Sequence, residues 1–335
     1  MLRPELNPTA SEMPLMWRVS SGTAAVLGLA PLRMDTAPTT AYIMLGERCL
    51  RNCAYCAQAH GSTASQAALS RVIWPMFPAR QIAQLVADAA MLGLIRRVCL
   101  QVTVGRSSMT ESLAALALLK QTSAVPVCCS IALDQDTDVA DLLIAGADQV
   151  TLALDAACER IYQQVRGADW EKLMTRLERA ARQFPGRLST HLIVGLGETE
   201  HEFVDRLQRL ADLVIGVGLF AFTPLAGTPM ADQPPPDLAG YRRMQVARWL
   251  VIVRHMNCSQ LSFSKTGHLI GYGIPLTQLR LLLQDGSAFR TSGCADCNRP
   301  YYNERPGGVM YNYPRPLDAE ESTREVEFLL ATLTS

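Results

Sequence analysis

Short apolar runs rich in β-branched residues alternate with longer amphipathic stretches along most of the chain. The runs predict strands at 40–45, 97–103, 125–131, 148–154, 187–194, 217–223, 259–264 and 287–292. The amphipathic stretches predict helices at 79–93, 109–122, 136–145, 168–184, 199–214, 237–256 and 275–284. Strand and helix in strict alternation indicate parallel strands with right-handed crossovers, so the pattern predicts an α/β fold closed into a (β/α)8 TIM-type barrel.

The two ends of the chain depart from this alternation. Residues 1–38 carry five prolines among short helical pieces, which predicts an N-terminal helical extension. The barrel is expected over residues 39–297. Residues 298–335 begin with a segment rich in Tyr, Pro and Gly and end in a helix from Asp318 to Thr332, so we expect a C-terminal lid and helix there.

Composition narrows the class of protein. Of 335 residues, 49% are hydrophobic and 19% charged, and the formal net charge is zero, which argues against partners such as nucleic acid or an anionic membrane. No apolar run reaches the length of a transmembrane helix. Ten cysteines without a secretory signal favour a reducing, cytoplasmic location over a disulfide framework.

Three cysteines follow the first predicted strand directly. Cys49, Cys53 and Cys56 have the spacing C-x3-C-x2-C. Three thiolates this close can hold three irons of a 4Fe-4S cluster and leave the fourth iron free to bind something else. A ferredoxin would supply four cysteines and a zinc ribbon two separated pairs, so the loop predicts an open cluster at the mouth of the barrel.

With Tyr55 just before the third cysteine, the loop resembles the signature of the radical S-adenosylmethionine (SAM) enzymes. The resemblance implies that the open iron binds the methionine part of SAM. An electron from the cluster would then yield a 5'-deoxyadenosyl radical that removes a hydrogen atom from an unactivated carbon. In such an enzyme the cofactors perform the radical chemistry, and the protein binds and orients the cofactors and the substrate.

The body of the chain resembles biotin synthase, which implies further SAM contacts. The turn that holds Gly195 and Gly197 would lie against the adenine, and Asp155 would hold the ribose hydroxyls. Arg166, expected in a loop, would pair with the methionine carboxylate in the bidentate manner that arginine favours. A tight turn after a strand and a solvated loop arginine remain the alternatives for these residues.

Biotin synthase also holds a two-iron cluster inside its barrel on three cysteines and an arginine. Cys99 and Cys129 match two of those cysteines, whereas Ser189 and Ser262 stand where the third cysteine and the arginine would be. Because side chains alternate along a strand, only one of Cys128 and Cys129 can point into the barrel.

A second pair, Cys294 and Cys297, opens a segment rich in tyrosine and proline near the C-terminus. This segment, together with the biotin synthase-like body, resembles the two-protein lipoyl synthases. The resemblance implies a second, auxiliary 4Fe-4S cluster as sulfur donor, with Cys294, Cys297, Cys99 and Cys129 as its candidate ligands. It also implies three partners: an octanoylated lipoyl-carrier protein or domain, a second radical SAM lipoyl synthase protein, and a reductant of the ferredoxin or flavodoxin type.

Other readings of the same residues stay open. The chain could be a biotin synthase acting on dethiobiotin, or a radical SAM mutase with one cluster in which Cys294 and Cys297 bind zinc or are structural. A non-catalytic iron-sulfur scaffold would leave the open cluster and the SAM contacts without a purpose.

Overall fold

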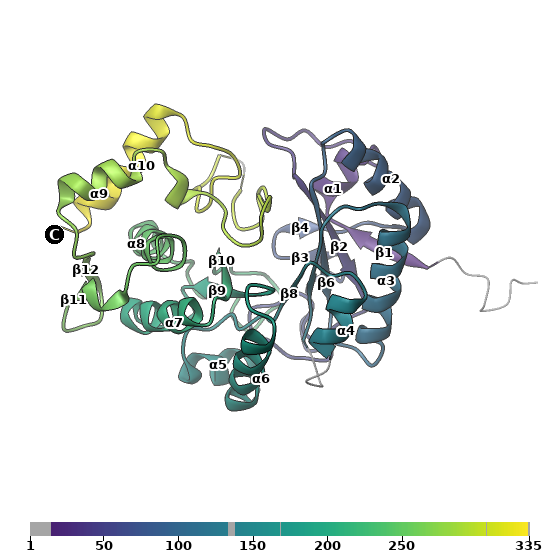
Figure 1. Cartoon of the computed structure of the whole chain (residues 1–335), viewed down its shortest axis with the longest axis horizontal. Coiled ribbons are helices and arrows are strands. Elements are labelled where there is room, and N and C mark those ends of the chain that lie inside the picture. Colours follow the sequence, from purple (N-terminus) through teal and green to yellow (C-terminus); the bar gives the residue numbers. More distant parts are fainter. Residues whose placement is uncertain (1–14, 133–137, 168, 306, 334–335) are drawn as a thin grey trace, which may run out of the picture.

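The computed structural model describes residues 15–132, 138–167, 169–305 and 307–333 (Figure 1). Its central sheet has the strand order β10-β9-β8-β7-β6-β2-β1-β5. Six neighbouring strands are parallel: β2 (Thr40–Leu45), β6 (Arg97–Val102), β7 (Val127–Ser130), β8 (Gln149–Thr151), β9 (Leu188–Val194) and β10 (Gly216–Ala221). The expected barrel-type α/β fold is therefore confirmed, and these are its first six predicted strands.

Helices occur close to every predicted position that the structure describes. They are α2 (Ala79–Met91), α3 (Ser108–Thr122), α4 (Asp138–Ile144), α6 (Trp170–Gln183), α7 (Glu200–Asp212), α8 (Leu238–Arg248), α9 (Leu276–Leu283) and α10 (Ala319–Ala331). The start of the predicted helix at 136 lies outside the described residues, as do residues 1–14. None of the described helices is long and apolar enough to cross a membrane.

The last two predicted barrel strands are wrong. Residues 262–263 form β11 (Ser262–Phe263), which pairs antiparallel with β12 (Leu269–Gly271) in a separate two-stranded sheet. Residues 287–289 form a single 3-10 turn. A short apolar run is equally compatible with a buried turn, so periodicity alone could not separate the two.

The N-terminal region contributes to the sheet. Strand β1 (Met16–Val19) pairs antiparallel with β2 on one side and with β5 (Met76–Pro78) on the other. Helix α1 (Ser21–Val26) follows, and a small hairpin of β3 (Ala68–Leu69) and β4 (Val72–Ile73) lies in the connection to β5. The described part of the predicted helical extension thus contains a strand as well as a helix.

Within the described residues the sheet does not close on itself, since β10 does not pair with the strands at the other end of the sheet. Residues 291–303 run across the opening between β10 and the end that holds β1 and β2. We call these residues the closing segment. On one side Ser292 Oγ accepts a hydrogen bond of 2.9 Å from the backbone N–H of Leu219 in β10. On the other, Asn298 Oδ1 accepts one of 3.0 Å from the N–H of Thr39, next to β2. The closing segment thereby covers an edge strand that would otherwise expose unpaired backbone groups.

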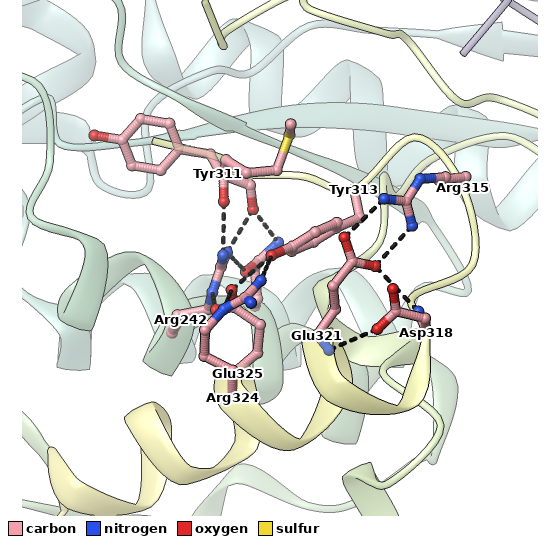
Figure 2. A network of polar contacts seen from close by, with 10 residues as sticks. Arg242, Tyr311, Tyr313, Arg315, Asp318, Glu321, Arg324 and Glu325 are labelled. Atoms are coloured by element: carbon pink, nitrogen blue, oxygen red, sulfur yellow. Dashed lines mark hydrogen bonds and ion pairs between the residues drawn. The ribbon is translucent and has the colours of Figure 1, made fainter. Parts of the chain in front are cut away.

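The chain after the closing segment is anchored by a buried ion pair (Figure 2). Arg242 of α8 is fully buried, and its Nε donates to Glu325 of α10 at 2.8 Å. Its other nitrogens donate to the carbonyl oxygens of Met310 and Tyr311, both at 2.6 Å. The hydroxyl of Tyr313 donates to Glu325 at 2.6 Å. Figure 1 shows the result, with α9 and α10 beside α8 at the end of the molecule opposite α1 and α2.

Substitution Arg242→Met should therefore lower the free energy of unfolding by about 3 to 5 kcal/mol, since it leaves the buried Glu325 carboxylate without its partner. Urea unfolding followed by circular dichroism measures this change. Arg280→Met is the matched control. Arg280 of α9 pairs with Glu327 of α10, the helix that also carries Glu325, but both side chains of this pair are about half exposed. Arg280→Met should lower the free energy of unfolding by at most about 1 kcal/mol. Equal losses of stability in the two variants would contradict the anchoring role of Arg242.

Candidate functional site

A cavity of about 440 Å³ lies at the carboxyl ends of the parallel strands. Its lining includes residues at or just beyond the strand ends, among them Val102, Ser130, Ile193 and Ala221. Barrel enzymes carry their active sites at this end of the sheet. We refer to this space as the mouth cavity.

The loop after β2 folds over the mouth cavity and is held in shape from within. Gly46 has φ 84°, and a side chain there would place its Cβ 2.3 Å from the hydroxyl of Thr103, so only glycine fits. The guanidinium of Arg48 donates to carbonyl oxygens further along the loop, those of Ala57, Ala59, Ser62 and Ala64, at 2.6 to 3.4 Å. Sequence analysis missed this role of Arg48, for which only its position next to the cysteine motif gave a signal.

Cys49, Cys53 and Cys56 all line the mouth cavity, and none is in a disulfide. The sulfur of Cys49 accepts hydrogen bonds from the backbone N–H groups of Arg51 at 3.4 Å and Val104 at 3.3 Å. Hydrogen bonds to cysteine sulfur are one means by which a protein tunes the potential of an iron-sulfur cluster.

The surroundings of these thiols suit a positively charged metal group. Burial raises the pKa of Cys53 and raises that of Cys56 to about 12, so the thiolates need a compensating charge. In the described part of the chain, no three His, Cys, Asp or Glu side chains are arranged to hold a single metal ion. Thiols spaced around a cavity fit a multi-iron cluster instead, in which each iron takes its own ligand.

Asp155, Tyr55 and Arg166 form one polar network on the wall of the mouth cavity. Asp155 accepts hydrogen bonds from the Tyr55 hydroxyl and from the Arg166 guanidinium. The side chains of Arg166 and Asp155 are only 8% and 12% exposed. Arg166 is the last residue of α5 (Glu159–Arg166), so the expectation that it lies in a loop is wrong.

Asp155 also has an unusual backbone. Its φ of 64° lies in the left-handed region, which is uncommon for a residue other than glycine. A single bridge to Leu192 in β9 holds it there, with the Asp155 N–H donating to the His191 carbonyl at 2.8 Å. Such conformations cluster at functional sites, where the surrounding structure maintains them.

The turn with Gly195 and Gly197 follows β9, and both glycines have positive φ, 99° and 114°. Glu198 accepts hydrogen bonds from the backbone N–H groups of Gly195 and Leu196, at 2.8 and 3.0 Å. Neither glycine is among the residues that line the mouth cavity. Their predicted contact with adenine remains a prediction.

A second set of cysteines meets on the inner face of the sheet. Cys99 in β6 and Cys128 in β7 are register partners, and Cys128 shares a hydrogen bond with Cys294 of the closing segment. Burial raises the pKa of the Cys99 thiol, and the thiols of Cys294 and Cys297 add to the shift. We call Cys99, Cys128, Cys294 and Cys297 the inner cysteines.

Cys129 points away from this set, so its assignment as a ligand is corrected to Cys128. The Cys129 side chain is fully buried among the residues that pack the helices onto the sheet, next to Ser112 of α3. Neighbouring residues of a strand face opposite sides of the sheet, and the register of β7 against β6 decides which of Cys128 and Cys129 faces inward.

Polar groups surround the inner cysteines. Arg97 donates to the Cys128 sulfur at 3.0 Å, and the Tyr42 hydroxyl lies 3.5 Å from the Cys297 sulfur. A hydrogen bond from Cys128 lowers the pKa of Cys294 to about 7, and Arg97 adds to the shift. Four thiols with such donors are a soft ligand set of the kind that holds an iron-sulfur cluster.

Residues between the two cysteine sets were missed by sequence analysis. Tyr302 lines the mouth cavity. Burial raises the pKa of its phenol, and Cys56 and Cys99, one thiol from each set, add to the shift. The ring centroids of Tyr302 and Phe220 lie 5.5 Å apart, and those of His191 and Phe220 4.9 Å apart. Burial lowers the pKa of His191 to about 4, so it is neutral at physiological pH.

Comparison with known proteins agrees with this geometry. Residues 43–210 match the family model of the radical SAM superfamily. A biotin synthase of Sulfurihydrogenibium sp. (strain YO3AOP1) is 25% identical over 154 residues, which are 44% of this chain and 45% of that protein. The matched part thus spans less than half of the length of this relative.

Two solved structures share the fold. Methylornithine synthase (PylB) superposes with a TM-score of 0.51 at 13% identity, covering 65% of this chain and 63% of that one. The [FeFe]-hydrogenase maturase HydG gives a TM-score of 0.50 at 12% identity, covering 64% and 50%. Since the superfamily model covers half of the chain, from within β2 to α7, and its cysteine motif lines the mouth cavity, the protein belongs to the radical SAM superfamily.

Proposed function

We propose that the protein is a sulfur-inserting radical SAM enzyme of the lipoyl synthase type. Its substrate is an octanoyl chain in amide linkage to a lysine, and an auxiliary 4Fe-4S cluster on the inner cysteines donates one sulfur. The observation that carries the proposal is the convergence of Cys99, Cys128, Cys294 and Cys297 inside the sheet, separated from the SAM-type cysteine loop by Tyr302.

When bound, the first cluster and SAM supply hydrogen-atom abstraction from an unactivated carbon. The chain itself holds and orients the reactants. Cys49, Cys53 and Cys56 would ligate the first cluster, while Asp155 and Arg166 offer an acceptor and a donor to the polar groups of SAM. Arg166 Nε has no hydrogen bond partner among the described residues, so it is a donor available to a ligand.

The position of Ser189 supports the lipoyl synthase type over a biotin synthase. Ser189 stands where biotin synthase would supply a cysteine, and it hydrogen bonds to Cys294. The closing segment thus brings a thiol to the place where β9 lacks one. Ser262 lies in the separate hairpin of β11, so its comparison with the arginine of biotin synthase does not hold; Arg97 lies beside the inner cysteines instead.

The proposal includes partners. The substrate chain would be presented by an octanoylated lipoyl-carrier protein or domain, a second radical SAM lipoyl synthase protein would insert the other sulfur, and a ferredoxin or flavodoxin would supply electrons. The alternatives are biotin synthesis from dethiobiotin and a one-cluster mutase, in which Cys294 and Cys297 would bind zinc or have a structural role.

Anaerobic turnover tests the proposal directly. The protein is incubated with SAM, a strong reductant and either an octanoyl-lysyl peptide or dethiobiotin, and the products are analysed by mass spectrometry. The peptide should gain the mass of one sulfur, and 5'-deoxyadenosine should accumulate. Sulfur in biotin instead, or 5'-deoxyadenosine without sulfur in either product, would contradict the proposal.

Removal of a first-cluster ligand should abolish SAM cleavage without unfolding the chain. Cys53→Ala leaves one iron without its thiolate, so 5'-deoxyadenosine formation should fall to background. The circular dichroism spectrum should stay close to that of the parent, because the loop lies at the functional end of the barrel. Retention of SAM cleavage in Cys53→Ala would contradict the assignment of this loop as the SAM-binding cluster site.

Replacement of two adjacent cysteines separates the two faces of β7. Cys128→Ala should lower the iron content from about eight to about four atoms per chain and stop sulfur insertion, since it removes a ligand of the auxiliary cluster. Cys129→Ala is the matched control and should keep both clusters, because Cys129 faces the helices. Iron analysis and electron paramagnetic resonance measure the cluster content of both variants. Loss of iron in Cys129→Ala but not in Cys128→Ala would contradict the assignment of Cys128 as the ligand from β7.

Asp155→Ala should weaken SAM binding. A carboxylate that holds a hydroxyl contributes a charge-assisted hydrogen bond, so its loss corresponds to roughly a ten- to a hundredfold higher dissociation constant. Equilibrium dialysis with SAM measures the constant, and Asp212→Ala, an exposed acid at the end of α7, is the control. An unchanged constant would show that Asp155 only organises Tyr55 and Arg166.

A further inference from the structure

A second cavity, of about 450 Å³, lies beside the closing segment. Its walls come from parts of the chain that are far apart in sequence: the stretch after α1, strand β2, the β3–β4 hairpin and residues 299–302. We call this space the side cavity. Its volume falls in the range of about 300 to 1,000 Å³ typical of small-molecule sites.

Three polar nitrogens of residues that line the side cavity have no hydrogen bond partner among the described residues. They are Arg71 Nε, Trp74 Nε1 and Arg299 Nε. Trp74 is only 1% exposed. Because a buried N–H group without an acceptor is costly, Arg71 Nε and Trp74 Nε1 point to a ligand that offers oxygen acceptors. The Arg299 guanidinium instead donates through Nη2 to the carbonyl of Ser292 and lies over the ring of Phe220. All three unpaired nitrogens are donors, and none is an acceptor.

The charges of the lining exclude some ligands. Arg33, Arg71 and Arg299 line the side cavity with a single carboxylate, that of Asp35, which already accepts a hydrogen bond from Tyr301 at 3.0 Å. The Arg299 guanidinium itself lies over the ring of Phe220, so Arg33 and Arg71 supply the charge nearest the opening. An ammonium group would therefore meet an excess of positive charge. A neutral carbonyl or a carboxylate fits this balance.

The remaining walls are apolar. Leu32, Met34, Pro38 and Val72 line the side cavity together with the rings of Tyr42 and Tyr302. Leu32 is 48% exposed, which places it at the opening toward solvent. A ligand with a hydrocarbon chain and one carbonyl end matches a space with apolar walls and a few fixed donors.

The side cavity borders both cysteine sets. The Tyr42 hydroxyl lies 3.5 Å from the Cys297 sulfur and accepts a hydrogen bond of 2.8 Å from the N–H of Arg299. Tyr302 lines the side cavity and the mouth cavity alike. Its carbonyl oxygen accepts a hydrogen bond of 2.7 Å from Ser70 of the hairpin, which fixes this residue as the wall between them.

We propose that the side cavity binds the straight acyl chain of the substrate, with the carbonyl oxygen accepting from Trp74 Nε1 and the chain directed past Tyr42 and Tyr302 toward the inner cysteines. The identity of the chain as octanoyl-lysine rests on the proposed function. The mouth cavity is left for SAM, so the acyl chain and SAM enter the interior of the sheet from different sides.

The test measures binding to the anaerobically reconstituted protein, with SAM and without reductant, by isothermal titration. The probes are a short peptide with an octanoyl-lysine, the same peptide with a neutral octyl ether in place of the octanoyl amide, the unmodified peptide, and free octanoate. Val72→Trp fills the side cavity, and Met34→Trp does so from another element. Ile73→Trp is the matched control, since Ile73 is the next residue of β4 and is 53% exposed.

Val72→Trp and Met34→Trp should each weaken binding of the octanoyl peptide about tenfold or more, and Ile73→Trp should change it less than about twofold. Trp74→Phe keeps an aromatic ring but removes the indole N–H, so it should weaken binding of the octanoyl peptide by roughly three- to tenfold and leave binding of the octyl ether peptide unchanged. Trp249→Phe, in a helical turn after α8, is the control for loss of an indole.

Octanoyl-peptide binding that is unchanged in both filling variants would overturn the inference, even if the parent inserts sulfur; the proposed function would then stand. Tighter binding of free octanoate than of the octanoyl peptide would overturn the assignment to a carrier-linked chain. Conversely, binding that depends on Val72 and Trp74 in a protein that inserts no sulfur would support the side cavity and refute the proposed function.

Discussion

The structure depends on how an open sheet is closed. Six parallel strands do not complete a barrel, so the inner face of the sheet and the edge of β10 would meet water without a cover. Hydrogen bonds between the closing segment and β10 on one side, and the β2 side on the other, supply that cover. The same segment carries Cys294 and Cys297, so the contacts that protect the edge also complete the set of inner cysteines.

This arrangement explains why the C-terminal part of the chain is anchored so firmly. A closing segment that moved would separate Cys294 from Cys128 and open the interior to solvent. The fully buried Arg242 links α8, α10 and the chain at Met310 through a charged pair and two carbonyl contacts. Breaking such a network leaves a buried charge unpaired, and the cost of that state keeps the segment in place.

The alternation of apolar and amphipathic runs was sufficient to predict the six parallel strands and the helices between them, because β2, β9 and β10 are buried along nearly their whole length and amphipathic helices separate the runs. It failed at 259–264 and 287–292, because the residues of the hairpin and of the turn there have a composition similar to that of a barrel strand. The loop with Cys49, Cys53 and Cys56 was found from spacing alone. Cys128 could not be chosen over Cys129, since the choice depends on the register of β7 against β6. The pairing of Ser189 with Cys294 was equally hidden, because it joins residues a hundred positions apart.

The central claim is that a cluster held by the inner cysteines is the source of inserted sulfur, and the origin of that sulfur can be measured. The protein is reconstituted with iron and sulfide enriched in a heavy sulfur isotope, freed of excess sulfide, and turned over once with the octanoyl-lysyl peptide and SAM. Mass spectrometry of the peptide should show the heavy isotope in the product. A product that contains only sulfur of natural isotopic composition would contradict a sulfur-donating cluster on these cysteines.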